Sequence, residues 1–163
     1  SDERDMVLDP GGGISKALPL LGNTPFFVMN GDGFWVDEGQ SSLQRLSAAW
    51  RDEEMDCLLL VTPLNRTTGF DGRGDFTMDG NGRLKRLAST SPEAFAYIGG
   101  YIAHPRIFDD APSGAFSMNV LWSRAIERGR LFGLEHQGRW FHVGTPEAIP
   151  LAEAGLRQMQ AKG

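Results

Sequence analysis

The sequence predicts an α/β fold, and the order of its apolar segments is the main evidence. A continuous apolar run (25–30), an amphipathic segment (42–53) and a second apolar run (56–62) follow one another along the chain. This order is typical of a βαβ unit, in which two parallel strands are joined by a right-handed crossover. The 163 residues are 40% hydrophobic and 23% charged. Such a chain can bury a core, and we expect a single domain over residues 1–163.

The first three elements follow from apolar patterning. The run from Pro25 to Asn30 lacks alternation and therefore predicts a strand buried on both faces, ending at the turn 31–33. After a polar loop, apolar residues recur at helical spacing from Ser42 to Glu53. The run from Asp56 to Thr62 predicts a second buried strand. We expect the two strands to pair in parallel.

An antiparallel excursion is expected next. The segments 75–78 and 83–87 flank residues 79–82, whose Asp-Gly and Asn-Gly pairs suit a tight hairpin. The chain returns as a strand from Ala96 to Ala103. Two adjacent glycines inside this strand indicate either a bulge or a ligand close to the backbone.

The last third predicts helix, hairpin and helix. Apolar residues recur at helical spacing between Ser117 and Arg128, with Ser117 as N-cap and a glycine after the end. The segments 131–136 and 139–143 predict a second hairpin. The sequence Thr145-Pro-Glu supplies an N-cap, a proline at the first helical position and an acidic first turn. Pro150 predicts a kink or restart in that helix.

Composition also bounds the partners. The net charge of −5 and pI near 5.2 provide no basic field for nucleic acid or anionic lipid, so we expect neither as a partner. The apolar runs are far shorter than the roughly 20 residues of a membrane helix. The single cysteine, Cys57, lies in an apolar run, which indicates a buried, inert thiol and allows no internal disulfide. These features favour a cytoplasmic protein.

Two glycine-containing segments are candidates for ligand binding. Gly11, Gly12 and Gly13 precede a short helical stretch, where they either form a plain turn or let a ligand approach the backbone. The segment from Asn30 to Asp32 ends the first strand. A carboxylate at the carboxyl end of a strand suits Mg²⁺, although a simple turn explains the same residues.

Two further segments admit a functional or a structural interpretation. Arg73 lies between two glycines, and Asp75 follows the second of them. Exposed charges in such loops are usually solvated. Alternation over 139–143 places Trp140 and His142 on one face of a strand. The histidine is either a core or rim residue, or a ligand.

Taken in order, five segments resemble the bacterial sugar-1-phosphate nucleotidyltransferases. They are 11–22, 30–32, 72–76, 97–105 and 140–147, and the resemblance runs from Leu8 to Ala154. It is strongest to the branch of N-acetylmuramate-1-phosphate uridylyltransferases and mannose-1-phosphate guanylyltransferase-like enzymes. The resemblance implies a Rossmann-like three-layer α/β/α fold with a mixed sheet, of which this chain is the C-terminal part, with the N-terminal strands missing.

The resemblance implies roles residue by residue. Asp32 would be the catalytic metal ligand, and the glycines at 11–13 would lie along the nucleotide. Substrate contacts would come from Asn30, Asp75, Gly99 and Gly100. The cofactor would be Mg²⁺, with Mn²⁺ as an alternative, because His142 stands where the family commonly has a second metal-binding aspartate, and imidazole suits Mg²⁺ poorly.

The implied reaction joins a sugar-1-phosphate to the nucleotidyl group of UTP or GTP and releases pyrophosphate, in nucleotide-sugar synthesis for the cell wall. The family's opening loop, which grips the triphosphate, has no match in this sequence. We therefore expect the chain alone to be inactive and its missing partner to be an N-terminal segment of the same protein. A non-catalytic module that binds sugar nucleotides is the alternative.

Overall fold

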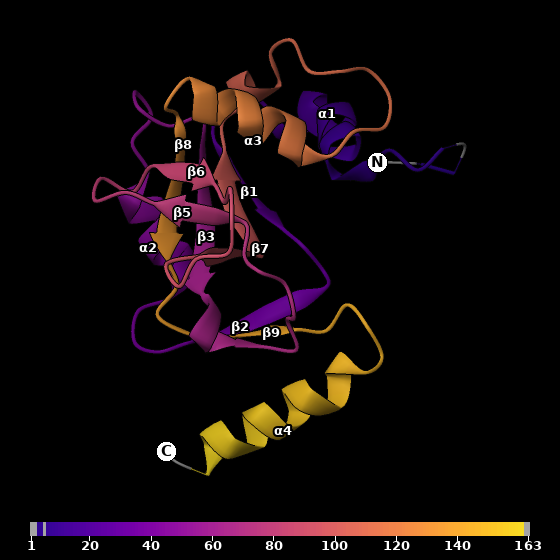
Figure 1. The fold of residues 1–163 in the computed structure, drawn as a ribbon. Helices are drawn as coiled ribbons and strands as arrows, with labels where there is room; N and C mark the ends of the chain where they lie inside the picture. Colours follow the sequence, from indigo (N-terminus) through magenta and orange to yellow (C-terminus); the bar gives the residue numbers. More distant parts are fainter. Residues whose placement is uncertain (1–2, 5, 162–163) are drawn as a thin grey trace.

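A computed structural model describes residues 3–4 and 6–161 of the chain (Figure 1). Its regular elements, in chain order, are α1 (Asp9–Leu21), β1 (Phe26–Met29), β2 (Gly33–Asp37), α2 (Ser42–Ala49), β3 (Cys57–Pro63), the 3₁₀ turn η1 (Leu64–Arg66), β4 (Thr67–Thr68), β5 (Phe76–Met78), β6 (Leu84–Arg86), β7 (Phe95–Ala103), the 3₁₀ turn η2 (Pro105–Phe108), α3 (Met118–Glu127), β8 (Leu131–Glu135), β9 (Gly138–His142) and α4 (Ala148–Gln160).

The larger sheet, sheet A, is mixed and confirms the predicted fold class. Its strand order is β6-β5-β7-β3-β8, and β1 pairs with β7. The β3–β8 pair is parallel, whereas β7 is antiparallel to β1, β3 and β5. Residues 57–62 are all buried because β3 lies inside the sheet, and their uninterrupted apolar run predicts this burial. A second, three-stranded sheet B has the order β2-β9-β4.

Other elements pack on both faces of sheet A, and α4 lies beyond sheet B (Figure 1). One core cluster joins α3 and the inner side of α1 to one face of sheet A, through residues such as Leu121 and Ile14. The second cluster joins the opposite face to α2 and sheet B, through Leu46 and Trp140. Sheet A is therefore covered on both faces.

The predicted parallel pairing of the first two strands is wrong. β1 and β3 run in the same direction, but β7 lies between them and pairs with both in antiparallel fashion. β1 is also an edge strand rather than one buried on both faces, since Phe27 is 46% and Met29 52% exposed. An apolar run indicates a strand but does not identify its neighbour, because the return strand β7 comes later in the chain.

The predicted hairpin over 131–143 is also wrong. β8 pairs with β3 in sheet A, whereas β9 pairs with β2 and β4 in sheet B. The chain turns between the sheets at the buried His136. Gly138 makes this corner possible, because its φ is +140° and a Cβ there would lie 2.1 Å from the Val36 carbonyl oxygen.

Sheet B also contains a strand that the sequence did not predict. Residues 33–37, expected to be a polar loop, form β2, which pairs with β9 so that Trp35 lies opposite Trp140. The loop expectation was wrong because Gly33, Asp37 and the glycines around them look like turn residues. The aromatic pair in the middle of the segment, Phe34-Trp35, was the signal for a strand.

Several local predictions are confirmed. β5 and β6 form the antiparallel hairpin around residues 79–82. In α3, the Ser117 side chain accepts a hydrogen bond from the Asn119 N–H, as expected of an N-cap. The β3–β7 register shifts near the two glycines, and Gly99 has a φ of +89°, which is a bulge.

The helix boundaries differ from the predicted ones. α2 ends at Ala49, before the predicted Glu53. α4 begins at Ala148 rather than directly after Thr145, which instead accepts a backbone hydrogen bond from Ala148. Pro150 thereby falls in the first turn, where a backbone N–H has no helical partner, so no restart is needed.

The glycines 11–13 do not form a turn before a helix but lie within α1. Gly11 and Gly12 are buried, and both donate backbone hydrogen bonds to the Phe116 carbonyl oxygen, at 2.9 and 3.2 Å. A Cβ on Gly11 would lie 2.5 Å from the Phe116 ring. These two glycines are therefore required for close packing of α1 against the segment before α3.

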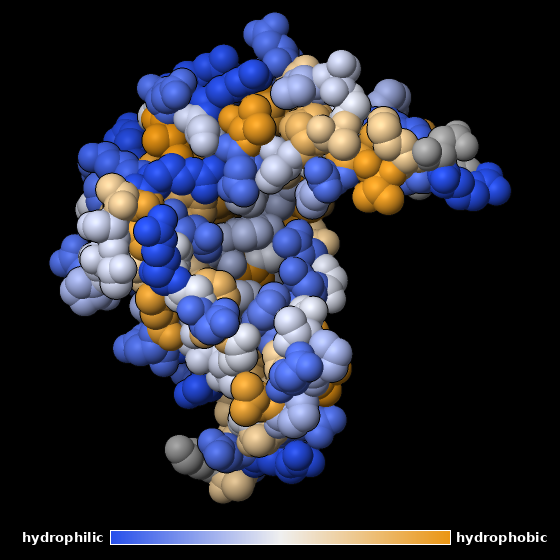
Figure 2. Space-filling model, turned by 45° about the vertical axis from the view of Figure 1, so that its right-hand side comes forward, coloured by the Kyte–Doolittle hydropathy of each residue, from blue (hydrophilic) through white to orange (hydrophobic). Residues whose placement is uncertain are grey.

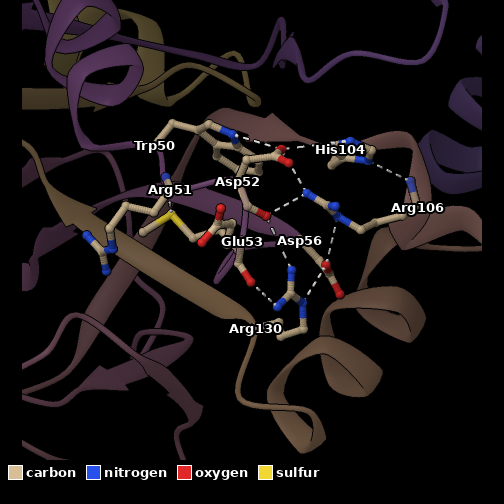
Figure 3. Close-up of polar contacts among 9 residues, drawn as sticks. Trp50, Arg51, Asp52, Glu53, Asp56, His104, Arg106 and Arg130 are labelled. Carbon is tan, nitrogen blue, oxygen red and sulfur yellow. Dashed lines mark hydrogen bonds and ion pairs between the residues drawn. The ribbon is translucent and has the colours of Figure 1, made fainter.

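An ion-pair cluster closes the end of sheet A where β3 begins and β7 ends (Figure 3). The Asp56 carboxylate is 3% exposed and lies between two guanidinium groups, 2.7 Å from Arg130 Nε and 3.2 Å from Arg106 Nε. Arg106 also contacts Asp52 at 2.8 Å. Because the carboxylate has two cationic partners, its burial is compensated.

Candidate active site

The candidate site lies at the other end of sheet A, where β1 ends. β1 delivers Asn30 directly after its last paired residue, Met29, which lies opposite Gly100. The Asn30 N–H donates to the Gly99 carbonyl oxygen at 2.7 Å. The positive φ of Gly99 allows this close approach, since a Cβ there would lie 3.2 Å from Asn30 Cβ. Asn30 is thus held by backbone contacts while its side chain remains exposed.

Tyr97 joins the two residues expected to contact the substrate. Its backbone N–H donates to the Asp75 carboxylate at 2.9 Å, and its hydroxyl donates to Asn30 Oδ1 at 3.4 Å. Burial raises the pKa of Tyr97 far above its usual range, so the hydroxyl stays protonated. The structure therefore brings Asn30 and Asp75 together through a residue that the sequence analysis did not identify. The alternation of Tyr97, Gly99 and Tyr101 on one strand was the available signal.

Asp32 and His142 also come together. The Val143 N–H donates to the Asp32 carbonyl oxygen at 2.9 Å, which joins the loop after β1 to the end of β9. A Cβ on Gly144 would lie 2.9 Å from His142 Nε2 and 3.6 Å from Asp32 Cβ. Gly144 therefore lies between the imidazole and the aspartate, at a position that has no room for a side chain. Asp32 is exposed and His142 is half-buried.

Asp32 and His142 are the two side chains predicted to hold a metal ion. Among the described residues, no group of three or more His, Cys, Asp or Glu side chains is arranged to hold a metal ion. Mg²⁺ nevertheless binds through one or two carboxylates together with water and substrate phosphates. The exposed Asp32 carboxylate fits that mode. The neighbouring imidazole of His142 suits Mn²⁺ better than Mg²⁺.

The two glycines expected to contact the substrate, Gly99 and Gly100, have different surroundings. Gly99 contacts Asn30, as described above. Gly100 instead packs under Trp35, because a Cβ there would lie 2.8 Å from the indole ring. On that side, Trp35 of β2 covers the Gly100 backbone, which the resemblance implied would contact the substrate.

Two hollows meet beside Asn30. A groove of about 650 Å³ runs between α1 and β1 and is lined by Gly13 and Asn30, with apolar side chains along its length. A smaller cavity of about 190 Å³ lies between β7 and α3, and Asp75 lines it. Pro10 and Asn30 line both. In Figure 2, the part of the molecule that carries α1 projects over a hollow, with apolar side chains in orange on it.

The fold is shared with solved structures of known proteins. A UDP-glucose pyrophosphorylase complexed with UDP-glucose superposes with a TM-score of 0.69 at 18% identity, over 92% of this chain and 63% of that one. HddC from Yersinia pseudotuberculosis, complexed with GMP-PN, gives 0.69 at 17% identity, over 93% of this chain and 64% of that one. The chain therefore has the fold of the sugar-1-phosphate nucleotidyltransferases.

Sequence comparison identifies nearer relatives. The chain is 39% identical over 160 residues to an N-acetylmuramate alpha-1-phosphate uridylyltransferase of Caulobacter vibrioides, covering 97% of this chain and 65% of the relative. A protein of the same name from Neisseria meningitidis is 28% identical over 148 residues, covering 90% and 62%. No family model matches. The resemblance predicted from the motifs is confirmed, and the chain spans a little under two thirds of these relatives.

No helix among the described residues combines the length and apolar character that crossing a bilayer requires.

Proposed function

We propose that the protein containing this chain transfers a nucleotidyl group from UTP or GTP to a sugar-1-phosphate. One observation carries the proposal: Asn30 and Asp75, distant in sequence, meet through Tyr97 beside a small cavity. The similarity to two uridylyltransferases over nearly the whole chain favours UTP. Their name makes N-acetylmuramate 1-phosphate the first acceptor to test.

The proposed chemistry is an in-line displacement. An oxygen of the sugar phosphate attacks the α-phosphorus, a new P–O bond forms, and the bond to the departing pyrophosphate breaks. Such reactions depend on positioning and charge stabilisation rather than on a nucleophilic side chain. Asn30 and Asp75 would position the sugar, because an amide can donate to phosphate or hydroxyl oxygens and a carboxylate accepts from hydroxyls. Gly99 would keep Asn30 in place through its contact with the Asn30 backbone, and Gly100 would contribute as part of the same bulge.

A divalent cation, when bound, would offset the negative charge that gathers on the phosphates. Asp32 would hold it as the catalytic metal ligand, with phosphate oxygens and waters as its other ligands. His142 would hold a bound water with Mg²⁺ or act as a direct ligand with Mn²⁺. The glycines 11–13 would support the nucleotide. Gly13 would do so from the groove, and the packing of Gly11 and Gly12 would fix the start of α1.

The remaining part of the protein is the proposed partner. The outer edge of β1 pairs with no other described strand. Next to it, the groove exposes Phe27, Met29 and Leu21. An open strand edge with apolar neighbours favours the addition of a further strand. We propose that the protein has a further segment, which corresponds to the third of the relatives that this chain does not cover. This segment would pair with β1 and supply the triphosphate contacts.

We also place the reaction in the cytoplasm, in the synthesis of cell-wall precursors. The free and buried Cys57 agrees with a reducing compartment.

The test separates binding from transfer. Titration calorimetry would measure binding of a sugar-1-phosphate to the wild-type chain and to Asp75→Asn. We expect the substitution to weaken binding about tenfold, since charged hydrogen bonds are worth about 1.5–3 kcal/mol. Glu93→Gln is the matched control, because it removes an exposed carboxylate elsewhere. Equal binding by wild type and Asp75→Asn would refute the assigned sugar site. Binding without pyrophosphate release in the complete protein would favour the non-catalytic alternative.

A further inference from the structure

The loop 69–75, between β4 and β5, connects the two residue pairs of the candidate site. At its start, Gly69 has a φ of +75°, and a Cβ there would lie 2.7 Å from the His142 carbonyl oxygen. At its end, the Asp75 N–H donates to the Phe95 carbonyl oxygen at 2.8 Å. The loop therefore contacts the end of β9 on one side and the start of β7 on the other.

Packing inside this loop fixes its path. The Phe70 ring lies against Trp140, with 5.4 Å between the ring centres, and meets the His142 ring edge-on at 6.5 Å. A Cβ on Gly72 would overlap the Phe70 ring. Gly74 has a φ of +92°, and a Cβ there would lie 2.9 Å from the Ala94 side chain. These contacts hold the loop without the side chain of the residue between the two glycines.

That residue is Arg73, whose guanidinium is available to a ligand. Asp71 and Asp75 lie two residues to either side of it, but Arg73 is exposed and forms no hydrogen bond or ion pair with another residue that the structure describes. Arg66, just before β4, differs in this respect, because it contacts the Glu135 carboxylate at 3.3 Å. Arg73 thus carries a charge that the fold does not use.

Arg73 also lies between two hollows. Asp71 lines one of about 400 Å³ together with His142. Asp75 lines the cavity of about 190 Å³ together with Asn30. Since two residues span at most about 7 Å of chain, the Arg73 backbone is close to both. A ligand that extends from Asn30 and Asp75 towards His142 would pass this arginine.

The charge of the candidate site makes a cation necessary there. The side chains assigned to it so far include two carboxylates, Asp32 and Asp75, and no arginine or lysine. The phosphate of a sugar-1-phosphate carries up to about two negative charges at neutral pH, and carboxylates alone would repel it. An arginine is always charged, and its planar guanidinium can donate two parallel hydrogen bonds to a phosphate.

We infer that Arg73 binds the phosphate group of the sugar-1-phosphate, while Asn30 and Asp75 hold the sugar. This inference rests on the proposed function, because it assumes that the sugar lies at those two residues. The guanidinium would contact the phosphate before and during transfer. Replacing Arg73 in the complete protein should therefore raise KM more than it lowers kcat.

The test measures dissociation constants for N-acetylmuramate 1-phosphate by titration calorimetry. Arg73→Gln should weaken binding about tenfold, the effect of losing one charged hydrogen bond. Arg73→Lys should weaken it only about threefold, because lysine keeps the charge but not the two parallel bonds.

Arg128→Gln is the matched control. Arg128 is exposed, and its side chain has no hydrogen bond or ion pair within the described part of the chain. It lies two residues before Arg130, at the opposite end of sheet A. We expect wild-type binding from this variant. Equal weakening by Arg128→Gln and Arg73→Gln would reflect net charge alone and would overturn the inference.

A second measurement does not depend on any variant folding. In wild type, the NMR signal of the Arg73 Nε–H should shift when N-acetylmuramate 1-phosphate is added. N-acetylmuramate, which has a carboxylate but no phosphate, should leave it in place. Equal shifts with both compounds would assign Arg73 to the carboxylate instead and overturn the inference.

The outcomes also separate this inference from the proposed function. If N-acetylmuramate 1-phosphate binds wild type and Arg73→Gln equally tightly, the inference is overturned while the proposed function stands. If it does not bind wild type at all, the proposed sugar site is refuted and the inference with it.

Discussion

At one end of sheet A, where β3 begins and β7 ends, a buried carboxylate lies between two arginines; beyond the end of β1, two carboxylates are exposed. Asp56 is held between Arg106 and Arg130 (Figure 3), whereas Asp32 and Asp75 face solvent. The first arrangement satisfies its charges within the chain. The second leaves carboxylates available to an external ligand. The same sheet thus separates a region that stabilises the fold from one suited to binding.

The largest effect is expected for activity of the isolated chain. Pyrophosphate release from UTP and N-acetylmuramate 1-phosphate should be undetectable with the 163-residue chain alone, because the chain spans 65% of its nearer relative and we propose that the triphosphate contacts lie in the part it does not cover. Loss of one preorganised donor costs about 100- to 1,000-fold in other enzymes, and a whole loop supplies several. Adding the segment that we propose pairs with β1 should restore release. Release by the chain alone would contradict the proposed division of the site.

The next effect concerns Asp32 in the complete protein. Asp32→Asn should reduce turnover at least about 100-fold, since a proposed metal ligand loses its charge. The melting temperature should change little, because this exposed side chain supports few core contacts. Glu38→Gln, which neutralises an exposed carboxylate nearby in sequence, should leave turnover unchanged. Near-normal turnover in Asp32→Asn would remove this residue from the mechanism.

The opposite end of the sheet should respond in stability. Asp56→Asn should lower the free energy of unfolding by about 3 kcal/mol, because it leaves two guanidinium groups without their shared carboxylate. Urea titration would measure the change. Glu54→Gln, which breaks the exposed pair with Arg51 in the adjacent turn, should cost at most about 0.5 kcal/mol. Equal effects of the two substitutions would show that burial does not distinguish the pairs.

The sequence predicted elements whose signals are local. The α3 cap at Ser117, the hairpin over 79–82 and the bulge at Gly99 each depend on residues within one short segment. The pairing of β1 and the separation of β8 from β9 depend on contacts between distant segments. The pattern of residues 131–143 does not reveal that the chain changes sheets at His136.

The candidate site divides in the same way. Motif order identified Asn30, Asp32, Asp75 and His142, and the structure places them in two neighbouring pairs. Tyr97 was not identified, because its role depends on the folding that brings Asn30 and Asp75 to the same strand, β7.

The smallest effect tests the corner between the two sheets by pH. His136 is buried, and its Nδ1 lies 2.9 Å from Ser42 Oγ. Burial lowers the pKa of His136, and Arg45 adds to this, while Asp37 and the backbone at Val36 and Arg139 oppose it. The unfolded chain therefore binds a proton at higher pH than the folded chain does. Stability should be constant above about pH 6.5 and should fall as the pH drops below that value.

The slope for one proton cannot exceed about 1.4 kcal/mol per pH unit. His104 contributes in the same direction, because burial and Arg106 lower its pKa. Unfolding free energies between pH 5 and 8 should therefore be compared for wild type, His136→Asn and His104→Asn. Since Asn does not titrate, His136→Asn should flatten the profile, and His104→Asn should flatten it less, because the His104 ring remains 18% exposed. An unchanged profile in His136→Asn would show that the corner histidine does not couple proton binding to folding.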